Sequence, residues 1–246
     1  MRPDELNAKN GRERPVLQRR KVAILAAIAA GFAVSASADP APSQSAEKQP
    51  FTRILRASYA GSHEVVSGSE FNKTLFEDKL TKQQLVTHLQ QRALIHNELH
   101  RVLIGADPAL RIPYGAPQKN VLVLLFSDLI ALGSGWPTGP QARPLTSEFL
   151  QQIRASEKQG PYFALGVHHV YYGGITNGGR MIGEKIADTV RFTSTYYSKS
   201  DGYEDYLPEI NKVTDPAARK EMIRGGRAAY QYIIASSNEE IFKAEK

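Results

Sequence analysis

The chain has 246 residues, enough for one domain of about 200 residues with an appendage, and its 41% hydrophobic content is compatible with a globular core. It contains no cysteine, which excludes a disulfide framework and any thiolate metal site. The net charge is +6, but residues 1–38 hold seven basic and three acidic residues, leaving 24 against 22 for the rest. No dense basic patch with interleaved aromatics remains, so we expect no nucleic-acid partner.

Residues 1–38 have the parts of a secretory signal peptide. A polar, basic stretch ending at Lys21 precedes a 13-residue apolar run, and Ala-Ser-Ala ends at Ala38. We therefore predict export, to the periplasm or out of the cell, with cleavage after Ala38. The alternatives are an uncleaved anchor in the inner membrane, which alone would make the chain membrane-bound, and an organelle-targeting peptide. The Pro/Ser-rich residues 39–50 predict a disordered linker, and 51–246 the folded domain.

From residue 51 the hydrophobic pattern is helical almost throughout, and no strand alternation is apparent, so the predicted class is all-α. Thr81 and Gln84 have the spacing of a capping box at the start of a long helix. Three prolines predict a loop over 105–117, and Thr146 is expected to be an N-cap. The expected helices cover 52–66, 71–76, 82–103, 121–132, 146–157, 203–212 and 215–242.

Four glycines within seven residues interrupt the helical pattern of residues 161–199: Gly173, Gly174, Gly178 and Gly179. Each glycine inside a helix costs about 0.5–1 kcal/mol relative to alanine. The pattern predicts a glycine-broken pair of helices, or a kinked helix whose backbone lies close against a flat partner. An ordinary loop between helices is the alternative.

The histidines offer two candidate sites. His96 and His100 lie four residues apart on one helical face, but no third ligand accompanies them, which favours a structural role. Arg56, Tyr59 and His63 also share a helical face. A neutral imidazole is a good ligand for haem iron, and a guanidinium one repeat away could hold a carboxylate of the same ligand. By itself this trio is also compatible with a packed or solvated face.

Several segments together resemble haem oxygenases. Residues 55–63, followed by Phe71 and then Thr81, are similar to the start of that family in their spacing. The segment Gly178–Gly183 is similar to the plant and algal branch, and residues 213–230 resemble the family's last helix. The resemblance implies an all-α, multi-helical haem-oxygenase-like bundle whose distal helix is kinked at glycines over the haem face.

The resemblance also implies roles for individual residues. His63 would be the proximal iron ligand, and Arg56 would contact a haem propionate and so set which ring carbon is cut. The catalytic part of the distal helix would comprise Gly174, Thr176, Asn177, Gly178 and Gly179. Further haem contacts would come from His168, Tyr172 and Arg180, with Lys185 and Arg191 as further possibilities for the propionates.

The chain departs from the family at one catalytic position. Many members carry an aspartate in the distal helix, where it orders water. Here that position is Gly174 or Ile175, and the plant-like branch also lacks the acid. Thr176 or Asn177 could supply a hydrogen bond instead.

The function implied is cleavage of haem, as both substrate and cofactor, to biliverdin, carbon monoxide and ferrous iron. The reaction would use O2 and an external electron donor such as ferredoxin, a reductase or ascorbate. One alternative is a haem-binding or haem-carrying protein that has kept the fold and lost turnover. Another is an all-α enzyme of different chemistry.

Overall fold

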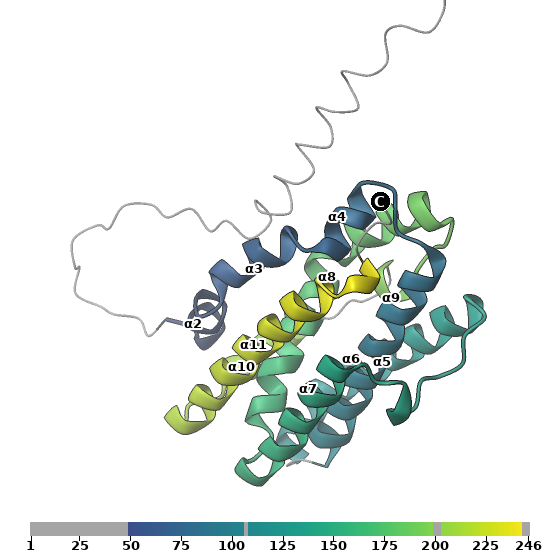
Figure 1. Ribbon diagram of the computed structural model, residues 1–246. Coiled ribbons are helices and arrows are strands. Elements are labelled where there is room, and N and C mark those ends of the chain that lie inside the picture. Colours follow the sequence, from purple (N-terminus) through teal and green to yellow (C-terminus); the bar gives the residue numbers. More distant parts are fainter. Residues whose placement is uncertain (1–48, 106–107, 199–202, 243–246) are drawn as a thin grey trace, which may run out of the picture. The chain divides into compact units, whose positions relative to one another are not determined.

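The computed structural model describes residues 49–105, 108–198 and 203–242, with their side chains except those of residues 108–119 and Glu240. The predicted signal peptide and nearly all of the predicted linker lie outside these ranges. The described residues form helices and no strand, which confirms the all-α class (Figure 1). The helices are α2 (Phe51–Ala57), α3 (Ala60–Ser67), α4 (Glu70–Phe76), α5 (Lys82–Ile104), α6 (Pro108–Ala131), α7 (Pro144–Ser156), α8 (Tyr162–Val190), α9 (Thr195–Ser198), α10 (Tyr203–Asn211) and α11 (Pro216–Ser237).

Helix α8 is the centre of the bundle. It packs most extensively against α11 and also contacts α5, α7 and α9 (Figure 1). Every residue from Phe163 to Gly173 is buried, so this half of the helix is covered on all sides. Among the described residues, no helix combines the length and apolar character needed to cross a membrane.

Glycines allow α8 and α11 to cross with their backbones in contact. A Cβ atom on Gly166 would overlap the main-chain carbonyl of Met222, and one on Gly225 would overlap that of Phe163. Next to this crossing, a Cβ on Gly226 would lie 2.7 Å from the ring of Tyr59. These three positions therefore require glycine for packing, whatever its cost in helix propensity.

Two of the expected helix starts are confirmed. Gln84 donates its main-chain N–H to the Thr81 hydroxyl over 3.2 Å, and Thr81 donates its own N–H to the Gln84 side chain over 2.8 Å. At the start of α11, the Asp215 carboxylate accepts from two main-chain N–H groups, and Pro216 occupies the first helical position.

The prediction of a loop over 105–117 was wrong, because α6 begins at Pro108. A proline in the first helical position lacks only an N–H that would be unbonded there. The long packing of α6 against α5 then outweighs the local preference of the later prolines. The first expected helix also differs, since it breaks at Ser58 and Tyr59 into α2 and α3.

Two further boundaries were wrong. Helix α7 begins at Pro144 with Arg143 as its N-cap residue, so Thr146 lies inside the helix. The buried Thr146 hydroxyl instead lies 2.8 Å from the Tyr232 hydroxyl on α11. Helix α11 ends at Ser237, and a short 3-10 turn, Glu240–Phe242, follows it.

The expected glycine-broken helix pair is one continuous helix, α8, of 29 residues. The energetic cost of its glycines is offset by tertiary packing, because α11 and α9 contact the helix at three of them, Gly166, Gly179 and Gly183. The chain leaves α8 at Arg191, which has a left-handed backbone conformation (φ 58°), and then turns back to form α9.

We expect Gly225→Ala to destabilise the protein by about 2–3 kcal/mol, because the new methyl group overlaps a backbone carbonyl that cannot rotate away. Urea unfolding would measure this change. The matched control is Gly174→Ala, whose methyl group meets no atom within 4 Å and which should be neutral or stabilising by up to about 1 kcal/mol. Equal stability of the two variants would contradict this account of the crossing.

Candidate functional site

The glycines in the second half of α8 fall into two groups. A Cβ on Gly173 would lie 2.9 Å from the Tyr203 hydroxyl, and one on Gly179 would lie 2.8 Å from the Tyr197 carbonyl, so protein packing accounts for both. By contrast, no atom lies within 4 Å of a Cβ placed on Gly174 or Gly178. Because these two residues are four apart, they share one helical face. Packing within the described residues does not account for Gly174 and Gly178, which we call the open glycines.

The segment from α2 to α4 follows the same part of α8. At one end, the Tyr59 ring lies 6.4 Å from the ring of His169. At the other end, the Thr189 hydroxyl donates to the Leu75 carbonyl over 3.4 Å, and Lys185 forms an ion pair with Asp78. Helix α3 lies between these two sets of contacts in the chain. Gly174 and Gly178 lie between the same two sets of contacts along α8, and α3 itself packs chiefly against α11.

His63 is on α3, one helical turn after Tyr59 and hence on the same face. Its side chain is half-buried, and burial lowers the pKa of the imidazole. The ring is therefore neutral at physiological pH, which is the form that binds iron.

Arg56 on α2 is exposed, and Tyr203 on α10 links it to the part of α8 that carries the open glycines. The Arg56 guanidinium donates to the Tyr203 hydroxyl over 3.4 Å, and its Cζ lies 5.6 Å from the centre of that ring. The same hydroxyl lies over Gly173, one residue before the first open glycine. Tyr203 was not among the residues predicted from the sequence, and no motif around it identifies it.

The polar residues between the open glycines bond to the backbone of their own helix. Thr176 donates its hydroxyl hydrogen to the Tyr172 carbonyl, and the Asn177 amide nitrogen donates to the Gly173 carbonyl, both over 2.8 Å. Asn177 keeps a second amide hydrogen and its carbonyl oxygen for other partners. Ile175 is buried, and residues 170–183 contain no carboxylate.

Three residues predicted to contact haem lie away from the open glycines. His168 and Tyr172 are buried in the core, with ring centres 5.2 Å apart, and His168 Nδ1 lies 3.1 Å from the Tyr206 hydroxyl. Arg180 is on the surface, where it forms an ion pair with Glu184. The first two support α8 from within the core.

Other predicted residues also have structural partners. Lys185 reaches the face of the open glycines but is paired with Asp78, and Arg191 caps the C-terminus of α8. His96 is fully buried, with Nε2 3.1 Å from the Tyr196 hydroxyl, which fits the structural role favoured for it. The described residues contain no group of three or more His, Cys, Asp or Glu side chains arranged to hold a metal ion.

Comparison with known proteins gives a match by structure and none by sequence. No protein-family model and no curated protein sequence matches the chain. The fold is similar to haem oxygenase from Leptospira interrogans, with a TM-score of 0.66, 16% identity, and coverage of 78% of this chain and 98% of that one.

Two Synechocystis structures are also similar. Haem oxygenase-2 in complex with haem and NO has a TM-score of 0.68 at 14% identity, covering 76% of this chain and 84% of the other. Haem oxygenase-1 in complex with haem has a TM-score of 0.66 at 16% identity, covering 77% and 91%. The chain therefore has the haem oxygenase fold, as the resemblance implied.

We expect the free energy of unfolding to fall as the pH drops from 7.5 to 5. Burial lowers the pKa of His169 to about 3 and holds those of His88 and His168 well below their usual value. The unfolded chain therefore binds more protons than the folded one in this range, which costs about 2 kcal/mol per buried histidine at pH 5. Urea unfolding at several pH values would measure how steeply the free energy of unfolding changes with pH, and His169→Gln should make this slope shallower. An unchanged slope in that variant would contradict the assignment to His169.

Proposed function

We propose that the chain binds haem between α3 and α8, with His63 as the iron ligand, and cleaves it oxidatively to biliverdin, carbon monoxide and ferrous iron. The observation that carries this proposal is the pair of open glycines, Gly174 and Gly178, on the stretch of α8 between its contacts with Tyr59 and Leu75. Two of the structures with the same fold are complexes with haem.

The open glycines suit a flat ligand. Each glycine in a helix interior costs about 1 kcal/mol relative to alanine, and here no contact within the described residues requires it. A planar macrocycle gains from the missing side chains, because it can lie against the main chain over its whole width. Gly173 and Gly179 flank this surface and hold it against Tyr203 and Tyr197.

The residues around this surface fit the polar parts of haem. The neutral imidazole of His63 would supply one ligand for the iron. Arg56 is exposed, and its guanidinium can bind a propionate carboxylate while staying close to Tyr203. When bound, haem supplies the redox chemistry, with O2 and electrons from an external donor such as ferredoxin, a reductase or ascorbate.

The chain's own residues then orient the macrocycle and limit the access of water. His63 and Arg56 fix its position and in-plane rotation, and the backbone of α8 covers one face. Gly178 and Gly179 contribute through their lack of side chains, whereas Asn177 is the nearest side chain with an unused amide hydrogen. We also propose that the N-terminal segment exports the protein.

A haem-binding or haem-carrying protein without turnover is the second candidate. Residues 170–183 offer no carboxylate to order water, and Thr176 and Asn177 already donate to backbone carbonyls. Export would also separate the protein from intracellular reductants. This candidate shares the binding site of the first and differs only in the fate of the ligand.

Turnover separates the two candidates. The wild-type protein, reconstituted with haem, should lose its Soret band when ascorbate is added in air and should release bilin, carbon monoxide and iron. A stable haem complex under these conditions would support the carrier instead. In both cases His63→Ala should lose the side chain that would bind the iron and at least tenfold in haem affinity, and added imidazole should restore the spectrum. Unchanged binding by His63→Ala would contradict the shared site.

Gly178→Leu tests the open face directly. The Cβ atom of the leucine would have no described protein atom within 4 Å, so stability should be unchanged or slightly higher. Because the side chain fills space that we assign to the macrocycle, haem affinity should fall at least tenfold, or by about 1.4 kcal/mol. The matched control is Glu184→Leu at an exposed position of the same helix, which should bind as the wild type does. Equal affinities in a Soret titration of both variants would rule out haem at this face.

A further inference from the structure

Helix α9 is held in place entirely by its neighbours. It has only four residues, and a helix of that length is not stable by itself in water. It nevertheless packs against both α6 and α8 (Figure 1). Its position therefore depends on a small number of tertiary contacts, which come from α5, α6 and α8.

The carboxylate of Asp128 on α6 binds the start of α9. Its Oδ1 accepts from the main-chain N–H of Thr195 over 2.8 Å and from the hydroxyl of the same residue over 2.7 Å. Its Oδ2 accepts from the Ser194 hydroxyl and, over 3.1 Å, from the main-chain N–H of Tyr196. Asp128 is 1% exposed, so these four bonds replace the water that a buried carboxylate loses.

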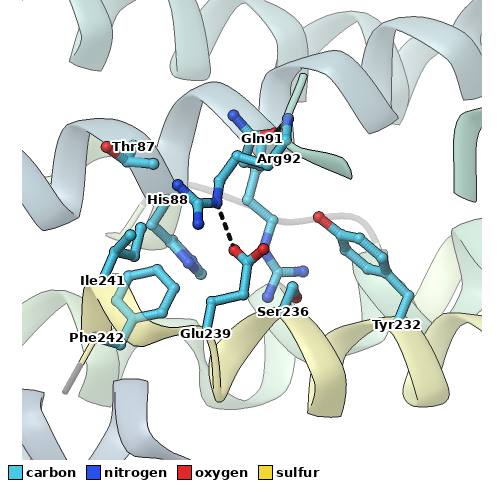
Figure 2. A pocket seen from close by; sticks show the side chains of 10 residues that line it. Thr87, His88, Gln91, Arg92, Tyr232, Ser236, Glu239, Ile241 and Phe242 are labelled. Atoms are coloured by element: carbon cyan, nitrogen blue, oxygen red, sulfur yellow. Dashed lines mark hydrogen bonds and ion pairs between the residues drawn. The ribbon is translucent and has the colours of Figure 1, made fainter. Parts of the chain in front are cut away.

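Two histidines of α5 bind the aromatic side chains of α9. His96 Nε2 lies 3.1 Å from the Tyr196 hydroxyl, and His88 Nε2 lies 2.8 Å from the Tyr197 hydroxyl. Figure 2 shows His88 beside Phe242, with 6.1 Å between the ring centres. The histidines thus orient the two tyrosine rings, whereas the carboxylate bonds fix the main chain of α9.

The main chain of α9 lies against α8 next to an open glycine. A Cβ on Gly179 would lie 2.8 Å from the Tyr197 carbonyl oxygen, and one on Gly183 would lie 3.2 Å from the Cβ of the same tyrosine. Gly178, whose own Cβ position is open, directly precedes Gly179. Because neither packed glycine has a side chain that could adjust, a shift of α9 moves the main chain of α8.

We propose that Asp128 is a positioning residue for the macrocycle, which acts by fixing α9 and thereby the main chain of α8 at Gly178. This inference rests on the proposed haem site, because that site assigns the side of α8 at Gly174 and Gly178 to the macrocycle. Asp128 acts through Tyr197 and leaves ligand contact to other residues. The carboxylate is the group required, because four donors converge on its two oxygens.

Hydrogen exchange of the protein without haem tests the first step. Asp128→Asn keeps the size of the side chain but turns an NH2 group toward two of the donors. Amides of residues 178–183 should then exchange about tenfold faster relative to those of residues 163–170 in the same helix. The matched control is Asp215→Asn, which alters the carboxylate cap of α11 and should leave this ratio unchanged. Equal ratios in the two variants would overturn the proposal, whether or not the chain binds haem.

Haem binding tests the second step. Asp128→Asn should lower haem affinity about tenfold in a Soret titration. It should also shift or broaden the infrared band of CO added as a probe to the reduced haem complex, because α8 is no longer held at one distance from the ligand. Asp215→Asn should change neither. Wild-type affinity and an unaltered CO band in Asp128→Asn would overturn the proposal, whereas a wild-type chain that binds no haem would overturn the haem site itself.

Ser194→Ala decides the matter if Asp128→Asn does not fold. It removes one of the four donors, together with the hydroxyl that accepts from the Tyr197 main-chain N–H over 3.4 Å, and leaves the carboxylate with three bonds. The amides of residues 178–183 should exchange about threefold faster by the same ratio, with a similar loss of haem affinity. An unchanged exchange ratio in Ser194→Ala would contradict the role assigned to Asp128.

Discussion

The backbone contact between α8 and α11 is the constraint on which the other helices depend. Gly166 of α8 lies against the main-chain carbonyl of Met222, and Gly225 of α11 lies against that of Phe163. At both points the two backbones are closer than any side chain would permit. Gly226 extends the same contact to Tyr59, whose ring lies 5.0 Å from that of Tyr230 on α11. Since Tyr59 immediately precedes α3, the crossing also fixes where the helix that carries His63 starts.

The two halves of helix α8 are packed differently. Its first half is buried among aromatic and aliphatic side chains, and His168 there lies within hydrogen-bond distance of the Tyr206 hydroxyl on α10. Its second half packs against α9 at Gly179 and Gly183 and against the end of α4 at Thr189, and the two open glycines lie apart from these contacts. The glycine-rich sequence therefore combines two requirements, close packing at Gly179 and an open main-chain surface at Gly174 and Gly178.

The sequence predicted the helices well where local signals agree with packing, as at Thr81 and Asp215, whose side chains bond to the first turn of α5 and α11. It failed where tertiary contacts override local preference, as along α6. The resemblance found the glycines and His63, but the sequence could not separate glycines that packing requires from those that face open space. That distinction depends on neighbours from distant segments, such as Tyr197 and Tyr203.

The difference between an enzyme and a carrier on this fold depends on proton delivery. Buried histidines with lowered pKa values are neutral near pH 7, so His168 and His169 carry no positive charge and are poor proton donors. The His–Tyr pairs beneath α8 therefore stiffen the helix rather than supply protons to its open face. If the chain cleaves haem as we propose, water bound at the remaining amide hydrogen of Asn177 would deliver the proton, because Ile175 is buried and residues 170–183 contain no carboxylate. The proposed turnover would thus require water to reach the side of α8 beside Asn177, whereas the proposed haem binding alone would not.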